Sequence, residues 1–151
     1  MNLSVIFYHP KNPQNLHDVA ALAASLRARL YVVPRPGVDY KLEMLQGRLR
    51  SRLVMVGSLA EAVDRIGDAN YIVLETYGNK YLHEVKMEGD SIVLVIGAED
   101  YGIPPSLLEA LKRPVTVAKI PTAVQGMSYN VAASLAMALY EVYRRLRAGS
   151  P

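Results

Sequence analysis

The sequence predicts an α/β fold in which helices flank both faces of a mostly parallel β-sheet. Short β-rich apolar runs alternate with longer segments of helical periodicity along the chain. Several of these runs are continuously apolar, which is typical of strands that are covered on both faces. The chain has 151 residues and no linker long enough to divide it. We therefore expect one domain over residues 1–151.

Six strands are expected, each a short run rich in β-branched residues. They cover residues 3–8, 29–33, 53–56, 71–74, 91–96 and 115–120. Between the second and third strands, the sequence PRPG at residues 34–37 predicts a turn.

The segments between the strands predict four helices. Residues 15–28 place apolar side chains on one stripe, formed by Leu16, Val19, Ala20, Ala23 and Leu26. Residues 58–66 begin with a serine cap and an acidic first turn, and residues 104–112 begin with prolines and end on a lysine. The last helix carries a second stripe, formed by Val131, Leu135, Leu139, Val142 and Leu146, which predicts a core-facing or interface surface.

The composition excludes several classes of protein. Cysteine is absent, so the chain has no disulfide, no thiolate zinc site and no cysteine nucleophile, which fits a reducing compartment. The N-terminus lacks the features of a secretory signal. The longest apolar run, VAASLAMALY, is far too short to span a bilayer. These features predict a soluble cytoplasmic protein.

Basic residues are concentrated in residues 27–52, where seven of them stand against two acidic ones, although the net charge of the chain is only +3. The candidate RNA-binding residues in this segment are Arg27, Arg29, Arg48, Arg50 and Arg52. Such a patch suits a polyanion, because neutralising phosphates releases their counterions. On charge alone, a merely solvated face is an equally good explanation.

Three loops are the expected places for a ligand, because ligands of open α/β sheets gather beyond the carboxyl ends of the strands. In the loop after residue 8, Asn15 either caps the next helix or meets a ribose or phosphate at its positive end. In the loop after residue 96, Gly97 permits close backbone approach to a ligand and Gly102 is expected at positive φ. Between them, Glu99 either faces the crevice or is a solvated carboxylate.

The third loop, IPTAVQGMSYN, runs directly into the last helix. Ser128 can cap this helix through its hydroxyl oxygen. Capping by Ser128 does not explain Asn130, a second polar side chain in the first turn, whose amide needs a partner nearby.

The second and third loops resemble motifs two and three of the SPOUT methyltransferases of the SpoU (TrmH) type. The matching residues are Gly97, Glu99, Gly102 and Ile103 in motif two, and Ile120, Pro121, Ser128, Asn130, Tyr140 and Glu141 in motif three. Residues 13–33 are similar, less closely, to motif one. The short chain looks most like the single-domain members that methylate the ribose 2′-oxygen of the tRNA wobble nucleotide.

The resemblance implies a C-terminal deep trefoil knot, a homodimer, and a pocket for S-adenosyl-L-methionine formed by the knot, without a metal. By position, the cofactor would contact Leu74, Thr76, Ile96, Gly97, Ile120, Met127 and Ser128. Backbone groups there can read the adenine edge while apolar neighbours bury the ring. The expected reaction is methylation of a ribose 2′-hydroxyl of RNA, with tRNA as the expected substrate.

The expected catalytic residues include one departure from the family. Relatives use asparagine and glutamate side chains to order the site, which implies Asn15, Glu99 and Asn130 here. Their motif-one arginine assists deprotonation of the hydroxyl, but its position holds Ala21 in this chain.

Three explanations for Ala21 stay open. Arg27 or Arg29 reaches the site from elsewhere, His17 acts as a base if it is not simply a surface residue, or catalysis has been altered or lost. The alternative functions are accordingly a catalytically altered or inactive knotted RNA-binding module, and a base-nitrogen methyltransferase.

Overall fold

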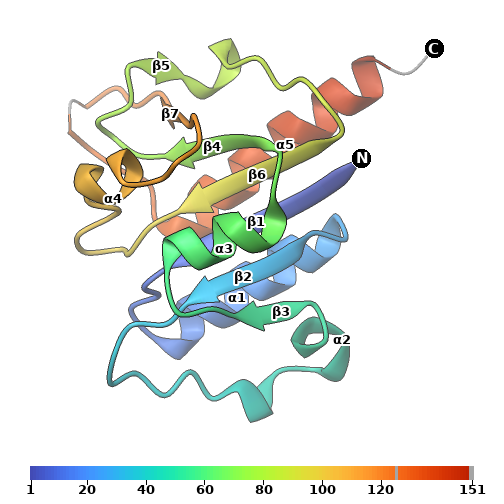
Figure 1. Cartoon of the computed structure of the whole chain (residues 1–151), viewed down its shortest axis with the longest axis vertical. Helices are drawn as coiled ribbons and strands as arrows, with labels where there is room; N and C mark the ends of the chain where they lie inside the picture. Colours follow the sequence, from blue (N-terminus) through green and yellow to red (C-terminus); the bar gives the residue numbers. More distant parts are fainter. Residues whose placement is uncertain (125, 150–151) are drawn as a thin grey trace.

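A single seven-stranded sheet forms the centre of the molecule, in the order β3-β2-β1-β6-β4-β7-β5 (Figure 1). This computed structural model describes residues 1–124 and 126–149. The strands are β1 (Asn2–Tyr8), β2 (Arg29–Val33), β3 (Leu53–Met55), β4 (Asn70–Leu74), β5 (Lys80–Tyr81), β6 (Ser91–Ile96) and β7 (Thr116–Lys119). Every pair of neighbouring strands is parallel. The six expected strands are confirmed, whereas β5 is too short to carry a periodic signal.

Helices cover both faces of the sheet, as the sequence predicts (Figure 1). On one face, α1 (Pro13–Ser25) and α5 (Val131–Ala148) pack against each other and against the sheet. On the other face lie α3 (Leu59–Ile66) and α4 (Pro105–Glu109). The connections contain the short elements η1 (Leu42–Met44), α2 (Gly47–Arg50) and η2 (Leu82–Glu84).

The two helical layers create two apolar cores separated by the sheet. Along β1, Val5 and Phe7 belong to the core under α1 and α5, while Ile6 between them belongs to the core under α3 and α4. All three side chains are fully buried. Successive strand residues point to opposite faces, so a strand covered on both sides is apolar at every position.

Most details of the expected helices are confirmed. The Ser58 hydroxyl caps α3 by accepting from the Glu61 amide at 3.0 Å. Both apolar stripes are buried, except that Leu26 is half-buried and Leu146 is 40% exposed. The expectation that residues 104–112 form one helix was wrong at its end, because α4 stops at Glu109. Pro114 disfavours helical geometry at the residue before it, and the chain turns into β7.

Because all strands are parallel, their last residues lie at one edge of the sheet and their first residues at the other. We call these the carboxyl edge and the amino edge. In Figure 1 the arrowheads mark the carboxyl edge, and α2 lies towards the amino edge. None of the helices in the described part of the chain is long and apolar enough to cross a bilayer. Among the same residues, no group of three or more His, Asp or Glu side chains is placed to hold a metal.

Candidate active site

The loops that follow β4 and β6 are fastened to each other at the carboxyl edge. The Glu75 carboxylate accepts from the Ile103 amide at 2.6 Å, and the Tyr77 hydroxyl donates to the Ile103 carbonyl at 2.7 Å. Burial raises the pKa of Glu75, although amide donors oppose the rise. Burial and the neighbouring Glu75 charge raise the pKa of Tyr77 to about 12. Sequence reasoning missed these contacts of Glu75 and Tyr77 with Ile103. Their only signal in the sequence is a polar residue, Glu75, directly after an apolar strand.

Two glycines make the close approach of these loops possible. A Cβ on Gly97 would lie 2.8 Å from the Gly102 carbonyl carbon, and one on Gly102 would overlap the Glu75 carboxylate. Gly102 has φ 63°, which confirms the expected positive φ. The Cβ position of Gly97 is filled by the chain's own motif-two loop, so this packing alone requires glycine; the close approach of a ligand to its backbone stays a prediction.

The structure gathers the expected cofactor residues on three neighbouring loops. Strand β4 pairs with both β6 and β7, so the loops after these strands lie side by side. Leu74 and Ile96 are buried at the ends of their strands, and Ile120 is half-buried just beyond β7. The other members are Thr76, Gly97, Met127 and Ser128, of which all but Gly97 are exposed. These residues thus lie on neighbouring loops at the carboxyl edge.

The polar junction before α5 is built differently from the expectation. Asn130, not Ser128, caps the helix, because the helix begins at Val131 and the Asn130 side-chain oxygen accepts from the Ala133 amide at 2.8 Å. Ser128 lies two residues too early for this role. The Tyr129 hydroxyl donates to the Pro121 carbonyl at 3.2 Å, which closes the loop that carries Ser128.

In the first loop, too, the residue that caps the helix differs from the expected one. Asn12 caps α1 by accepting from the Asn15 amide at 2.9 Å, so the capping role expected for Asn15 was wrong. The helix begins earlier than expected because Pro13 is well suited to the first helical position. Asn15 is therefore half-buried in the first turn; its backbone amide donates to Asn12, while its side-chain amide makes no hydrogen bond to the residues that the structure describes.

His17 lies on the next turn of α1 and is tied to the body of the domain. Its Nε2 lies 2.8 Å from the Tyr40 carbonyl oxygen, in a partly buried position. A carbonyl only accepts, so Nε2 must carry the proton and donate. This bond leaves Nδ1 as the only ring atom that could accept a proton.

The tip of the motif-two loop is held by three neighbouring contacts. The Glu99 carboxylate accepts from the Lys11 amide at 2.9 Å, and the Tyr101 hydroxyl is hydrogen bonded to His9 Nδ1 at 2.7 Å. Between them, Asp100 forms a two-bond ion pair with Arg35, at 2.6 and 3.0 Å. The hydrogen bond from Arg35 lowers the pKa of Asp100 to about 2. The loops after β1, β2 and β6 thus form one polar cluster.

Arg35 is the centre of that cluster, and sequence reasoning did not select it as a site residue. It also donates to the His9 carbonyl at 3.2 Å. Its Nε and the second oxygen of Glu99 are both shielded from solvent, and neither finds a hydrogen-bond partner within the described residues. Buried polar atoms are rarely left unpaired, so the two atoms mark a place where a ligand or a small rearrangement is expected. The PRPG turn is the signal that could have located Arg35 at a strand end.

Comparison with known proteins identifies the family of the chain. The model of the SpoU rRNA methylase family matches residues 2–140. The chain belongs to this family. A tRNA (cytidine(34)-2'-O)-methyltransferase of Escherichia coli strain K12 is 25% identical to this SpoU-family chain over 156 aligned positions, covering 95% of this chain and 94% of the relative.

Two solved structures are similar to this SpoU-family chain over most of its length. A structure that describes the 2-OH methylation of C/U34 on tRNA is 26% identical, with a TM-score of 0.77, and the match covers 96% of this chain and 91% of that one. The SpoU methyltransferase AviRb of Streptomyces viridochromogenes, in complex with AdoMet, has a TM-score of 0.75 at 20% identity. That match covers 98% of this chain and 62% of AviRb, and it confirms the SpoU-type fold.

The position of the family's motif-one arginine is exposed on α1, where Ala21 stands. Within one protomer, the structure contradicts the suggestion that Arg27 or Arg29 reaches the site instead. Arg29 is the first residue of β2, at the amino edge, and Arg27 lies two residues before it. A strand of this length separates them from the carboxyl edge by roughly 15 Å. Arg35, which follows the same strand at its other end, lies instead at the carboxyl edge, where it pairs with Asp100.

The five candidate RNA-binding arginines gather near the amino edge rather than at the candidate active site. Arg48 and Arg50 lie on α2, and the Arg52 guanidinium donates to the Arg27 carbonyl at 2.9 Å. With Arg29 at the start of β2, they lie on the β2–β3 side of the SpoU-family sheet. Any phosphates that they bind would therefore lie away from the reacting nucleotide bound to the same protomer.

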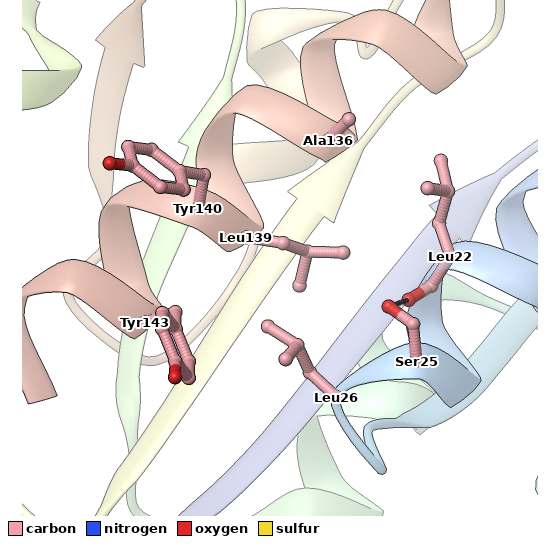
Figure 2. A pocket seen from close by; sticks show the side chains of 7 residues that line it. All are labelled: Leu22, Ser25, Leu26, Ala136, Leu139, Tyr140 and Tyr143. Carbon is pink, nitrogen blue, oxygen red and sulfur yellow. Dashed lines mark hydrogen bonds between the residues drawn. The ribbon is translucent and has the colours of Figure 1, made fainter. Parts of the chain in front are cut away.

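An apolar groove lies between α1 and α5, away from the loops of the site (Figure 2). It has a volume of about 250 Å³ and is lined by Leu22, Ser25, Leu26, Ala136, Leu139, Tyr140 and Tyr143. The serine hydroxyl is satisfied by the Leu22 carbonyl at 2.6 Å, so the groove offers almost no free polar group. Such a surface suits an apolar partner rather than a polar ligand.

Proposed function

We propose that this protein is an S-adenosyl-L-methionine-dependent RNA methyltransferase that methylates a ribose 2′-hydroxyl of tRNA. The observation that carries the proposal is the convergence of the loops after β4, β6 and β7 at the carboxyl edge, in a chain of the SpoU rRNA methylase family. The similarity to the tRNA (cytidine(34)-2'-O)-methyltransferase, whose alignment covers 95% of this chain, supports both tRNA as the substrate and methylation of the ribose as the reaction.

The cofactor, when bound, supplies an electrophilic methyl group. In our proposal the loops with Leu74, Ile96 and Ile120 bury its adenine, and Ser128 and Met127 close over it. Holding the acceptor oxygen in line with the methyl carbon lowers the barrier chiefly through positioning. The protein's remaining task is to orient the ribose and to accept its proton.

Asn15, Glu99 and Asn130 are the side chains that we propose for orienting the acceptor. Asn15 has an uncommitted side-chain amide at the positive end of α1, and Glu99 has an unpaired oxygen. Asn130 uses its oxygen as a cap but keeps its amide nitrogen for a ligand. His17 is held by the Tyr40 carbonyl, so its proposed contribution is limited to Nδ1.

Cofactor binding and labelled methyl transfer test the proposal directly. Calorimetry with S-adenosyl-L-methionine should show binding that is lost in Ser128→Tyr, a change at an exposed position. Bulk tRNA incubated with labelled cofactor should yield, after nuclease digestion, a nucleoside methylated on the ribose.

Each other outcome has its own meaning. A label on a base nitrogen would identify a base methyltransferase. Binding without transfer would identify the altered or inactive RNA-binding module that Ala21 suggests, and no cofactor binding at all would remove the enzyme hypothesis. Transfer should persist in the presence of a chelator, since we propose that no metal takes part.

We also propose that the C-terminal part is threaded into a deep trefoil knot. The tight packing of the loops supports this, because a Cβ on Gly78 would lie 2.9 Å from the backbone of Ala118 in β7. Threading is rare in proteins, so periodicity alone does not suggest it. Stretching the denatured chain from both ends should give an extended length shorter than that of an unknotted chain.

The groove between α1 and α5 is the surface that we propose for a homodimer in the cytoplasm. Tyr140 is 66% exposed and Tyr143 is 45% exposed, both beside the groove. Exposed aromatic side chains around an apolar groove are typical of an interface. A second copy of the same chain can offer the same tyrosines in return across a two-fold axis.

A further inference from the structure

The tip of the motif-two loop carries an exposed aromatic ring that the proposed function leaves unexplained. Tyr101 is 49% exposed, although it stands between Asp100, which is ion-paired, and Gly102, which is packed on Glu75. An Ala98–Gly102 bridge closes the loop behind it. The ring is therefore presented by a short, closed turn and not by a loose loop.

Contacts on its hydroxyl and on one ring face fix the orientation of Tyr101. Its hydroxyl is held by His9 Nδ1 at 2.7 Å, and the His9 ring is itself stacked on Tyr8 with centroids 3.9 Å apart. The Arg35 guanidinium lies over one ring face, 4.7 Å from the centroid. Arg35 in turn is locked by the ion pair with Asp100. A ring that is held in this way loses little conformational entropy when it binds a ligand.

We propose that Tyr101 is a stacking platform that binds the base of the nucleotide to be methylated, with Arg35 as the residue that positions it. This inference rests on the proposed function. Aromatic side chains commonly stack on unpaired bases in single-stranded loops of RNA. Because Glu99 is two residues away on the same turn, the base would lie on Tyr101 while the ribose reaches Glu99.

A double-mutant cycle, which combines one protein variant with one RNA variant, tests whether Tyr101 stacks on the base. The protein variant is Tyr101→Leu, and the RNA variant carries an abasic ribose at the methylated position, which keeps the 2′-hydroxyl but removes the base. A stacked base contributes about 1–3 kcal/mol, so Tyr101→Leu should raise KM for intact RNA by about 5- to 150-fold. With the abasic RNA, wild type and variant should differ by less than about 2-fold.

Two further variants separate stacking from structure. Tyr101→Phe keeps the ring and should stay within about 3-fold of wild type, whereas Arg35→Gln should raise KM for RNA because the ring is no longer held. Tyr81→Leu is the matched control. Tyr81 is 39% exposed and has Lys119 5.0 Å from its ring centroid, but it lies on β5 at the end of the sheet, and its loss should leave KM unchanged.

The outcomes distinguish this inference from the proposed function. S-adenosyl-L-methionine affinity should be the same in wild type and Tyr101→Leu. An unchanged KM in Tyr101→Leu, or an equal defect with the abasic RNA, would overturn the platform while leaving the enzyme intact. If wild type transfers no methyl group, the proposed function fails, and the affinity for fluorescent tRNA, measured by anisotropy, still decides whether Tyr101→Leu weakens RNA binding.

Discussion

At the scale of single residues, Gly102 and Glu75 depend on each other. The positive φ of Gly102 turns the motif-two loop so that the Ile103 amide meets the Glu75 carboxylate. The same turn places the Gly102 α-carbon against that carboxylate, with no room for a side chain. A conformational requirement and a packing requirement therefore coincide at one position.

Substitution of Gly102 by alanine should lower the free energy of unfolding by more than the unfavourable backbone conformation alone explains. A non-glycine residue at such a φ costs about 1–2 kcal/mol, and the overlap with Glu75 should add to it. Urea unfolding followed by circular dichroism measures the loss. Gly37→Ala is the matched control, because Gly37 also has a positive φ, 81°, but nothing lies within 4 Å of its Cβ position. Equal losses in the two variants would show that the contact with Glu75 is unimportant.

The raised pKa of Glu75 predicts a pH dependence of stability. In the folded state this carboxyl binds its proton more tightly than in the unfolded chain, where its ordinary value is 4.5. Stability from this group is therefore fully present below pH 4.5 and is lost as the pH rises through the folded-state pKa. In Glu75→Gln the side-chain oxygen can still accept from the Ile103 amide, but the side chain has no proton to lose. Between pH 4 and pH 7, the melting temperature of the wild type should therefore fall relative to that of the variant. A wild type–variant difference that stays constant over this range would contradict the assignment.

At the scale of elements, α5 is fastened to the sheet connections by one residue of its last turns. Arg145 donates to the carbonyls of His83 at 2.7 Å and Leu82 at 3.3 Å, and also to the Val85 carbonyl. Glu141, one turn earlier, accepts from the Arg145 guanidinium at 2.7 Å. The arginine thus satisfies the carbonyls of η2 and ties this segment to α5.

Removal of this contact should destabilise the protein by about 1.5–3 kcal/mol, the usual range for hydrogen bonds to a charged group. Arg145→Gln tests it in urea unfolding. Arg144→Gln provides the comparison, because Arg144 also pairs with Glu141 but is half-exposed and contacts no carbonyl among the bonds described. That variant should cost less than about 1 kcal/mol. Similar losses for both would mean that the η2 contacts contribute little.

The elements were largely predictable from sequence, whereas the tertiary contacts of the site were not. Continuous apolar runs mark strands such as β6 because both faces are buried, and this signal is local. The choice between Asn12 and Asn15 as cap, or between Ser128 and Asn130, depends on where the helix begins, to within a few residues. Arg35 meets Asp100 across 65 residues of sequence, so no local pattern reveals the pair.

At the scale of the whole molecule, the groove between α1 and α5 predicts the oligomeric state. Tyr140→Asp should convert the proposed dimer into a monomer, because it places a charge on an apolar interface without disturbing a buried contact. Light scattering after size-exclusion chromatography measures the mass. Met44→Asp is the control, since Met44 is 73% exposed on η1, away from the groove, and should leave the mass unchanged. A dimeric Tyr140→Asp protein would place the interface elsewhere.

The pairing of β1 with β6 has a consequence for how the chain acquires its fold. Asn2 lies opposite Ser91, so the central ladder joins segments about ninety positions apart. Contacts between such distant segments slow folding, because a long loop must close before they form. During synthesis, β1 and β2 can associate early but must wait for β6, with the inner edge of β1 unpaired. The molecule is therefore expected to fold late and slowly, and most of the growing chain emerges before its centre exists.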